Sequence, residues 1–241
     1  MYKYKFLMLK DLRLAWKDPV LMAVLIGPLM LLLLSRWGYP VADNWLDVNY
    51  SFQLEPYRGF TASLLVTTIP MLTGMLTGLL MLDERDENMI AYYAVTPLSN
   101  KGYLLYRLAL PFLLCTVLSI AYLSLSNLSE IGVDSLFVIL LLALEAPLFS
   151  LILVAFSANK VEGLAFSKIG GLFIAGPVVA TFVPGGWQVL GGWLPTYWPA
   201  KTPLLMTNNE PFLVLVFLLV GLLLHFIYLY LMATVFVNRK S

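Results

Sequence analysis

Six long apolar runs, separated by short segments that hold nearly all of the charges, are the main feature of this sequence. A helix of about 20 apolar residues crosses a hydrocarbon core about 30 Å thick, and the runs have that scale. A soluble helical protein would need polar faces at helical spacing, and most of the runs have none. We therefore expect an all-α membrane protein whose transmembrane domain, residues 20–241, has spans at about 20–38, 59–82, 103–125, 134–158, 169–184 and 211–237.

The first run follows a basic stretch, as the apolar part of a signal peptide does. No small-x-small cleavage site follows it closely, since the next residues read Ser35-Arg36-Trp37-Gly38. We therefore expect an uncleaved first span.

The positions of Lys and Arg predict the orientation. If both termini lie in the cytoplasm, the inner segments hold twelve of the 15 basic residues and the outer segments hold three, namely Arg36, Arg58 and Lys201. Because basic residues concentrate on the cytoplasmic side, we expect a multi-pass protein of a bacterial or archaeal cell (inner) membrane with both termini inside.

Residues 1–19 have an amphipathic pattern. Apolar positions fall on one arc of a helical wheel and basic positions on the other, although a few apolar residues interrupt the basic side. This pattern favours a helix that lies in the inner headgroup layer near anionic lipid. Lys17-Asp18-Pro19 then predicts a turn into the first span.

The densest charge cluster, Asp83-Glu84-Arg85-Asp86-Glu87, leads into an aromatic and apolar stretch that ends near Pro97. We expect Asp83 to cap a short cytoplasmic helix, with the acidic residues in its first turn. A metal or acid–base site would need a nearby His or Cys, and a solvated loop would not explain the aromatic residues. A helix that binds a soluble partner explains both, and the residues that we expect in its contact include Met89, Tyr92, Tyr93 and Pro97.

The second inner segment, residues 159–168, again mixes charge with apolar side chains. It is either a plain connecting turn in which Gly163 is the pivot, or a second contact for the same partner through Glu162 and Gly163.

Glu145 is an ionisable residue in the middle of the fourth apolar run, next to Pro147. A charge at that depth costs roughly 2.5 kcal/mol or more, so Glu145 should face other helices or water. It lines a translocation path or is a protonated, hydrogen-bonded packing residue, and the lack of an evident basic partner favours the second interpretation. The lone His225 and the lone Cys115 read as structural residues.

The outer segment 185–199 is rich in Gly, Pro and aromatic residues, including Trp187, Trp193 and Trp198. It fits an interfacial aromatic belt. It equally fits a re-entrant hairpin, whose backbone would have to be sheltered by protein or water.

The sequence contains no G-x-x-x-x-G-K-[ST] phosphate loop, no H-E-x-x-H and no G-x-S-x-G. We therefore expect no catalytic residues, no metal site and no cofactor in this chain, and no nucleic-acid partner.

Four features resemble the permease subunits of type-2 ABC exporters, most closely the drug (fluoroquinolone-type) export permeases. They are the N-terminal helix that ends at Lys17-Asp18-Pro19, the segment 82–99, the segment 159–168 and the Gly/Trp/Pro-rich segment before the last span. The segment from Leu82 to Ser99 is the most distinctive of the four.

This resemblance implies a permease that dimerises, with itself or with a second permease, above two separate ATPase subunits that bind ATP and Mg²⁺. It implies that 83–99 is the coupling helix, that 159–168 is a second ATPase contact, and that 185–199 forms re-entrant helices in which the three Trp residues make an outer gate. A stand-alone membrane protein, such as an immunity or sensor component, is the alternative, and an intramembrane enzyme using Glu145 is a third. The apolar spans suit an amphipathic drug, peptide or lipid as substrate rather than a small ion.

Overall fold

The computed structural model describes residues 17–89, 99–128, 135–206 and 211–238, and within these ranges every regular element is a helix. Among the described residues, six helices are long and apolar enough to cross a membrane, which agrees with the predicted number of spans. Their bounds are Pro19–Tyr50, Glu55–Asp86, Gly102–Leu125, Ser135–Phe156, Lys160–Phe182 and Phe212–Asn238.

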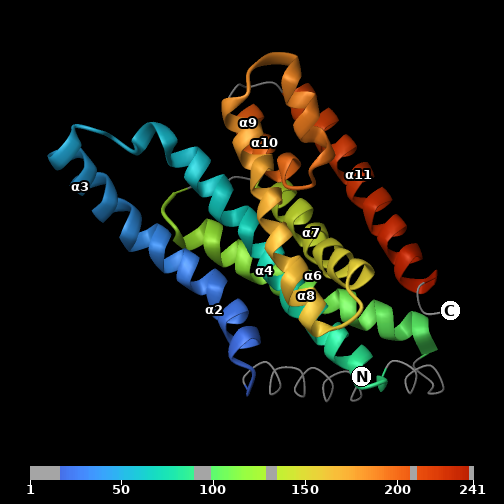
Figure 1. The fold of residues 1–241 in the computed structure, drawn as a ribbon. Coiled ribbons are helices and arrows are strands. Elements are labelled where there is room, and N and C mark those ends of the chain that lie inside the picture. The colour runs from blue at the N-terminus through green and yellow to red at the C-terminus, as the bar shows by residue number, and fades with distance from the viewer. Residues whose placement is uncertain (1–16, 90–98, 129–134, 207–210, 239–241) are drawn as a thin grey trace.

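The first span is longer than its apolar run predicts. Helix α2 (Pro19–Leu33) continues through a π-helical turn, η1 (Leu34–Gly38), into α3 (Tyr39–Tyr50). The combined 32 residues extend about 48 Å at about 1.5 Å per residue, well beyond a hydrocarbon core of about 30 Å. No residue of α3 is buried, and α3 diverges from the other helices in Figure 1.

Helices α4 (Arg58–Asp86) and α7 (Ser135–Phe156) form the centre of the bundle. A glycine lets their backbones approach closely, because a Cβ built on Gly74 would lie 2.5 Å from the carbonyl oxygen of Ala146. The Ser150 hydroxyl donates to the carbonyl oxygens of Gly74 and Ala146, at 3.0 Å in each case. Helix α6 (Ser99–Leu125) packs against both α4 and α7, and α11 (Pro211–Asn238) packs against α7.

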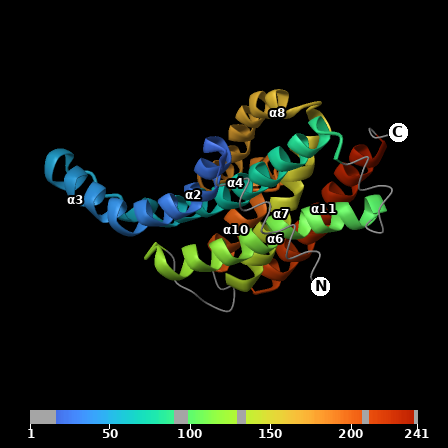
Figure 2. The same cartoon turned by 90° about the horizontal axis from the view of Figure 1, so that it is seen from below.

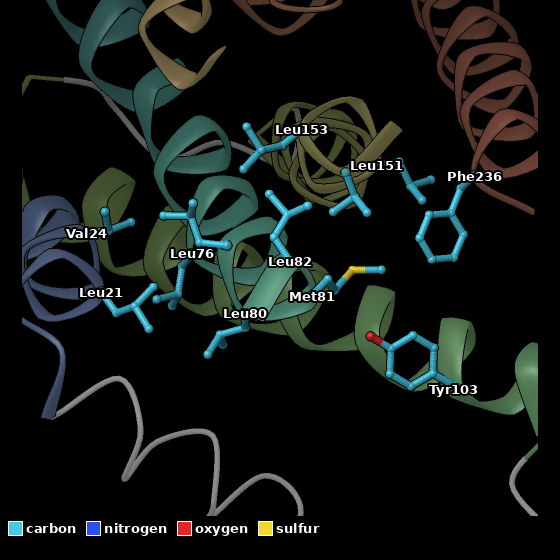
Figure 3. Packing of buried hydrophobic residues seen from close by; sticks show 12 residues of the cluster. Leu21, Val24, Leu76, Leu80, Met81, Leu82, Tyr103, Leu151, Leu153 and Phe236 are labelled. Carbon is cyan, nitrogen blue, oxygen red and sulfur yellow. The ribbon is translucent and has the colours of Figure 1, made fainter. Parts of the chain in front are cut away.

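The largest apolar cluster lies near the C-terminal end of α4 (Figure 3). Leu79, Leu80, Met81 and Leu82 are each at most 3% exposed, and they pack with side chains from α2, α6, α7 and α11. We call this end of the bundle the Lys160 end, after the residue at which helix α8 (Lys160–Ser167) begins. The start of α2, the end of α4 and the end of α11 all lie there, in the lower part of Figure 1.

The fifth span consists of three helical segments and begins earlier than predicted. It comprises α8 (Lys160–Ser167), the 3-10 helix η3 (Lys168–Ile174) and α9 (Ala175–Phe182). Of the two interpretations of 159–168, the plain connecting turn is therefore wrong, because Asn159 caps a helix by accepting a hydrogen bond from Glu162 N at 2.9 Å. Figure 2 shows α8 beside the end of α4.

The Gly/Trp/Pro-rich segment is also helical. A 3-10 helix, η4 (Gly185–Trp193), leads into α10 (Tyr197–Met206), which contacts α4, α7, α9 and α11. Tyr197 and Trp198 are buried in a cluster with residues of α7, α9 and α11. We call this the η4 end, opposite the Lys160 end in Figure 1.

Candidate functional site

Lys160 joins three segments that are far apart in the sequence. Its Nζ lies 2.7 Å from Asp18 Oδ2 and 2.7 Å from Asp83 Oδ2, and its backbone N–H donates to Asp86 Oδ2 at 3.0 Å. The hydrogen bond from Lys160 holds the pKa of the Asp18 carboxyl below its usual value. Asp18 is also the cap of α2, since its Oδ1 accepts from Val20 N at 2.9 Å. The starts of α2 and α8 and the last turn of α4 are thereby connected.

The predicted helix cap at Asp83 is wrong. Residues 83–86 form the last turn of α4, and the chain leaves that helix at Glu87 and Asn88, where the φ angle of Asn88 is 56°. An apolar helix continues through this charge cluster because the charges find partners on neighbouring helices. The cluster therefore belongs to the transmembrane bundle itself, and Tyr92, Tyr93 and Pro97 lie outside the described residues.

Glu84 and Arg85 form contacts within the bundle. Glu84 is 9% exposed and accepts hydrogen bonds from Arg107 Nε at 2.9 Å and from the Tyr103 hydroxyl at 2.7 Å. Arg85 donates to the carbonyl oxygens of Ser157, at 2.7 Å, and Val154, at 3.2 Å, in the last turn of α7 and just after it. These two residues therefore link the end of α4 to α6 and α7.

The remaining predicted contact residues differ in exposure. Glu87 and Glu162 are exposed, Met89 is half-buried, and Glu162 Oε2 accepts from Ala158 N at 2.7 Å. Gly163 is buried, and a Cβ at this position would collide with Leu82. Gly163 is thus a close-packing residue between α8 and α4, which replaces its expected role as a pivot.

A large apolar cavity lies between α4, α7, α11, the fifth span and the end of η4. Its volume is about 480 Å³. Phe149 of α7 and Phe173 of η3, whose ring centroids lie 4.9 Å apart, both line it. The other lining side chains are also mainly apolar, and they include Met71, Met75, Ile152, Phe156, Phe166, Trp193, Tyr228 and Met232.

The three Trp residues of the predicted outer gate lie in different environments. Trp187 and Trp193 are exposed, whereas Trp198 is 7% exposed and its Nε1 donates to Gly192 O at 3.0 Å. Trp193 alone among the three lines the apolar cavity. The structure therefore separates one packing tryptophan from two surface tryptophans.

Glu145 has a partner that sequence reasoning missed. It is fully buried in α7, and its Oε1 lies 3.5 Å from Nε2 of His225, which is fully buried in α11. The sequence carried one signal for this pair, because both residues sit near the middle of their apolar runs and hence at similar depth. The buried partners of the charge cluster, Arg107 and Tyr103, were also missed, since both looked like part of the third span.

Comparison with known proteins identifies the family. The profile of the family described as "Fluoroquinolones export permease protein Rv2686c-like" matches residues 11–233. The fluoroquinolones export permease proteins MT2760 and Rv2686c of two Mycobacterium tuberculosis strains, CDC 1551 / Oshkosh and H37Rv, are each 34% identical to this chain over 196 residues. The alignments cover 79% of this chain and 77% of each relative. No solved structure matches the chain. This chain therefore belongs to the Rv2686c-like family of export permeases, which are multi-pass membrane subunits of transporters.

Proposed function

We propose that this chain is the membrane-spanning permease subunit of an ATP-driven ABC exporter. Two permease subunits form the translocation path, and separate ATPase subunits, which bind ATP and Mg²⁺, attach at the Lys160 end. That end faces the cytoplasm, because most of the chain's basic residues belong to segments on that side of the membrane. Membership of an export permease family supports this proposal.

The observation that carries the coupling part of the proposal is the triple contact of Lys160. Two of the three segments it joins, the charge cluster at Asp83 and Asp86 and the segment that begins at Lys160, are those that the resemblance implies for the ATPase contact. The third, which ends at Asp18, is the expected interfacial helix. A displacement applied there by ATP binding would reach α2, α4 and the fifth span together. Arg85, which contacts the end of α7, extends the same connection.

The apolar cavity supports a substrate class. Its volume of about 480 Å³ falls within the range of about 300–1,000 Å³ that is typical of small-molecule sites. Aromatic side chains from four segments line it, and such a surface favours flat aromatic molecules. The two relatives are named for the export of fluoroquinolones, and we propose an aromatic, amphipathic drug as the substrate here.

Co-expression tests the proposal. The chain would be purified from native membranes together with candidate ABC ATPases, and drug-stimulated ATP hydrolysis would be measured in proteoliposomes. Lys160→Gln should lower this stimulation at least several-fold while leaving basal hydrolysis by the ATPase intact. Lys168→Gln, which removes an exposed lysine from the neighbouring η3, is the matched control.

Two results would contradict the proposal. If no ATPase copurifies with the chain and export proceeds without nucleotide, the stand-alone membrane protein is the correct interpretation. If Lys160→Gln and Lys168→Gln both leave the stimulation unchanged, the Lys160 contact is not part of the coupling.

A bulky substitution inside the cavity, Ile152→Trp, should reduce transport, whereas Leu223→Trp on the exposed face of α11 should not.

A further inference from the structure

Glu145 and His225 face each other near the middle of α7 and α11, and neither side chain has any exposed surface. Glu145 Oε1, Glu145 Oε2 and His225 Nε2 are buried without a hydrogen-bond partner among the described residues. We infer that this pair is a proton-binding site that holds one proton between its two side chains and ties α11 to α7 inside the membrane.

The contact of the other ring nitrogen determines the tautomer of His225. Nδ1 lies 2.6 Å from the carbonyl oxygen of Gly221, one helical turn earlier in α11. A carbonyl oxygen can only accept, so Nδ1 must carry a hydrogen. In a neutral ring Nε2 is then a bare acceptor, and it carries a hydrogen only when the ring is an imidazolium.

This tautomer restricts the number of protons between Glu145 and His225. A carboxylate beside a neutral ring would place two acceptors face to face and bury a net negative charge. A protonated carboxyl could still accept from an imidazolium through its carbonyl oxygen, but the pair would bury a net positive charge. Buried charges are stable only when they are paired, so a single proton, on Oε1 or on Nε2, satisfies both groups. Its transfer breaks the O–H bond, forms the N–H bond and leaves the pair neutral.

The neighbouring helices supply no competing charge in the described part of the chain. From α6, the Cys115 thiol interacts electrostatically with Glu145 and donates to Leu142 O at 3.2 Å. From α4, the Thr73 hydroxyl donates to Ile69 O at 2.9 Å. The charged residues of the elements that pack against α7, where their side chains are described, make contacts elsewhere; they are Arg58, Asp83, Glu84, Arg85, Asp86, Arg107, Lys160, Glu162 and Lys201.

The pair also explains what fixes the orientation of α11 about its own axis. The buried positions in its first two-thirds are Leu218, Gly221 and His225, which recur at three- and four-residue spacing on one narrow face. Most of the surrounding surface of α11 is exposed and apolar, so many rotations of this helix would suit lipid equally well. A polar contact at one position removes that freedom, because any other rotation leaves both groups unsatisfied.

The test uses the full-length protein, in which His225 is the only histidine. Nitrogen-15 NMR of histidine-labelled protein in lipid nanodiscs reports the protonation of each ring nitrogen at a single site. Infrared spectroscopy of the wild type and of Glu145→Gln reports whether the carboxyl of Glu145 is protonated. Glu55→Gln is the matched control, since the Glu55 side chain is 63% exposed.

We expect Nδ1 to carry a hydrogen at every pH from about 5 to about 8, the range in which a free histidine titrates. We also expect either an imidazolium with no protonated-carboxyl band from Glu145, or a neutral ring with such a band that Glu145→Gln removes. A neutral ring without the band, an imidazolium with the band, a hydrogen on Nε2 alone, or free titration over this range would each overturn the inference.

A double-mutant cycle tests the tie between the helices. Glu145→Ala and His225→Ala should each lower the thermal unfolding midpoint, and the double variant should lose clearly less than the sum of the two losses. Additive losses would show that the pair does not hold α11 against α7. This result is independent of any ATPase, so it can fail while the proposed export function stands.

Discussion

Arg107 of α6 binds Glu84 of α4 through two nitrogens, and both residues are buried at the Lys160 end of the bundle. Arg107 Nε donates to Oε2 at 2.9 Å and Nη2 donates to Oε1, while the Tyr103 hydroxyl donates a third hydrogen bond to Oε2 at 2.7 Å. Because a bidentate pair with an added donor satisfies most of the carboxylate's lone pairs, the two charges can remain inside the protein. This contact allows α4 to continue as a helix beyond the apolar core and through its charge cluster.

Removing one partner of this pair should be costly. Arg107→Met leaves Glu84 buried and unpaired, so we expect the free energy of unfolding to fall by about 3–5 kcal/mol. Equilibrium unfolding of the detergent-solubilised protein, followed by circular dichroism, measures the change. The control is Glu55→Gln, which removes an exposed pair with Arg58 and should cost at most about 1 kcal/mol. Equal losses in the two variants would show that the Glu84–Arg107 pair contributes no more than a surface pair.

The Lys160 contact should make stability depend on pH in the acidic range. Since the pKa of Asp18 is lower in the folded protein than in the unfolded chain, its contribution is complete above the unfolded pKa, about 3.9. The contribution is lost as the pH falls through the lower folded pKa. We therefore expect Lys160→Gln to destabilise the protein at pH 6 and to have a smaller effect below about pH 3. Unfolding midpoints at both pH values check this expectation, and an effect that grows on acidification would contradict it.

The close approach of α4 and α7 predicts a sharp contrast between two glycines of α4. Gly74→Ala would place a methyl group against the backbone of α7, and we expect a loss of about 1–3 kcal/mol from overpacking. Gly59→Ala meets no atom within 4 Å and should be neutral or stabilising by up to about 1 kcal/mol. Thermal melting of the two variants tests the contrast, which is absent if Gly74→Ala melts like the wild type.

Substitutions of the three Trp residues should have different effects on stability and on transport. Trp198→Ala should lower the free energy of unfolding by about 3–5 kcal/mol, because a large side chain leaves a packed cluster. Trp187→Ala should change it by less than about 0.5 kcal/mol, since Trp187 is exposed. Trp193→Ala should leave stability similarly unchanged but alter drug efflux from cells, because Trp193 lines the apolar cavity. Unchanged efflux in this variant would show that the cavity is not part of the translocation path.

The number of spans could be predicted from the sequence because hydropathy depends on local composition. The helix cap at Asp83 was predicted wrongly because that prediction also used only local composition. Charged residues normally mark the end of a span, and the local pattern could not show that Arg107 and Lys160, far along the chain, neutralise Glu84 and Asp83 within α4. These ion pairs form only in the folded protein, and they outweigh the local tendency of charged residues to end a span.

The same limit applies to the candidate site. Glu145 could be singled out because a carboxyl inside an apolar run is costly. A similar depth alone could not assign His225 as its partner, because the contact depends on which face of α11 meets α7. The apolar cavity could not be predicted at all. Its lining combines residues from five separate segments with no shared sequence pattern.

The contact between Gly74 and the backbone of α7 also decides which parts of the subunit can move during a transport cycle. Two helices in backbone contact cannot slide without breaking the hydrogen bond from Ser150, so α4 and α7 act as a fixed frame. Relative movement is then left to the elements around this frame, among them α3, which has no buried residue. Spin labels on α4 and α7 should keep their separation throughout the transport cycle, whereas labels on α3 should change their distance from this frame.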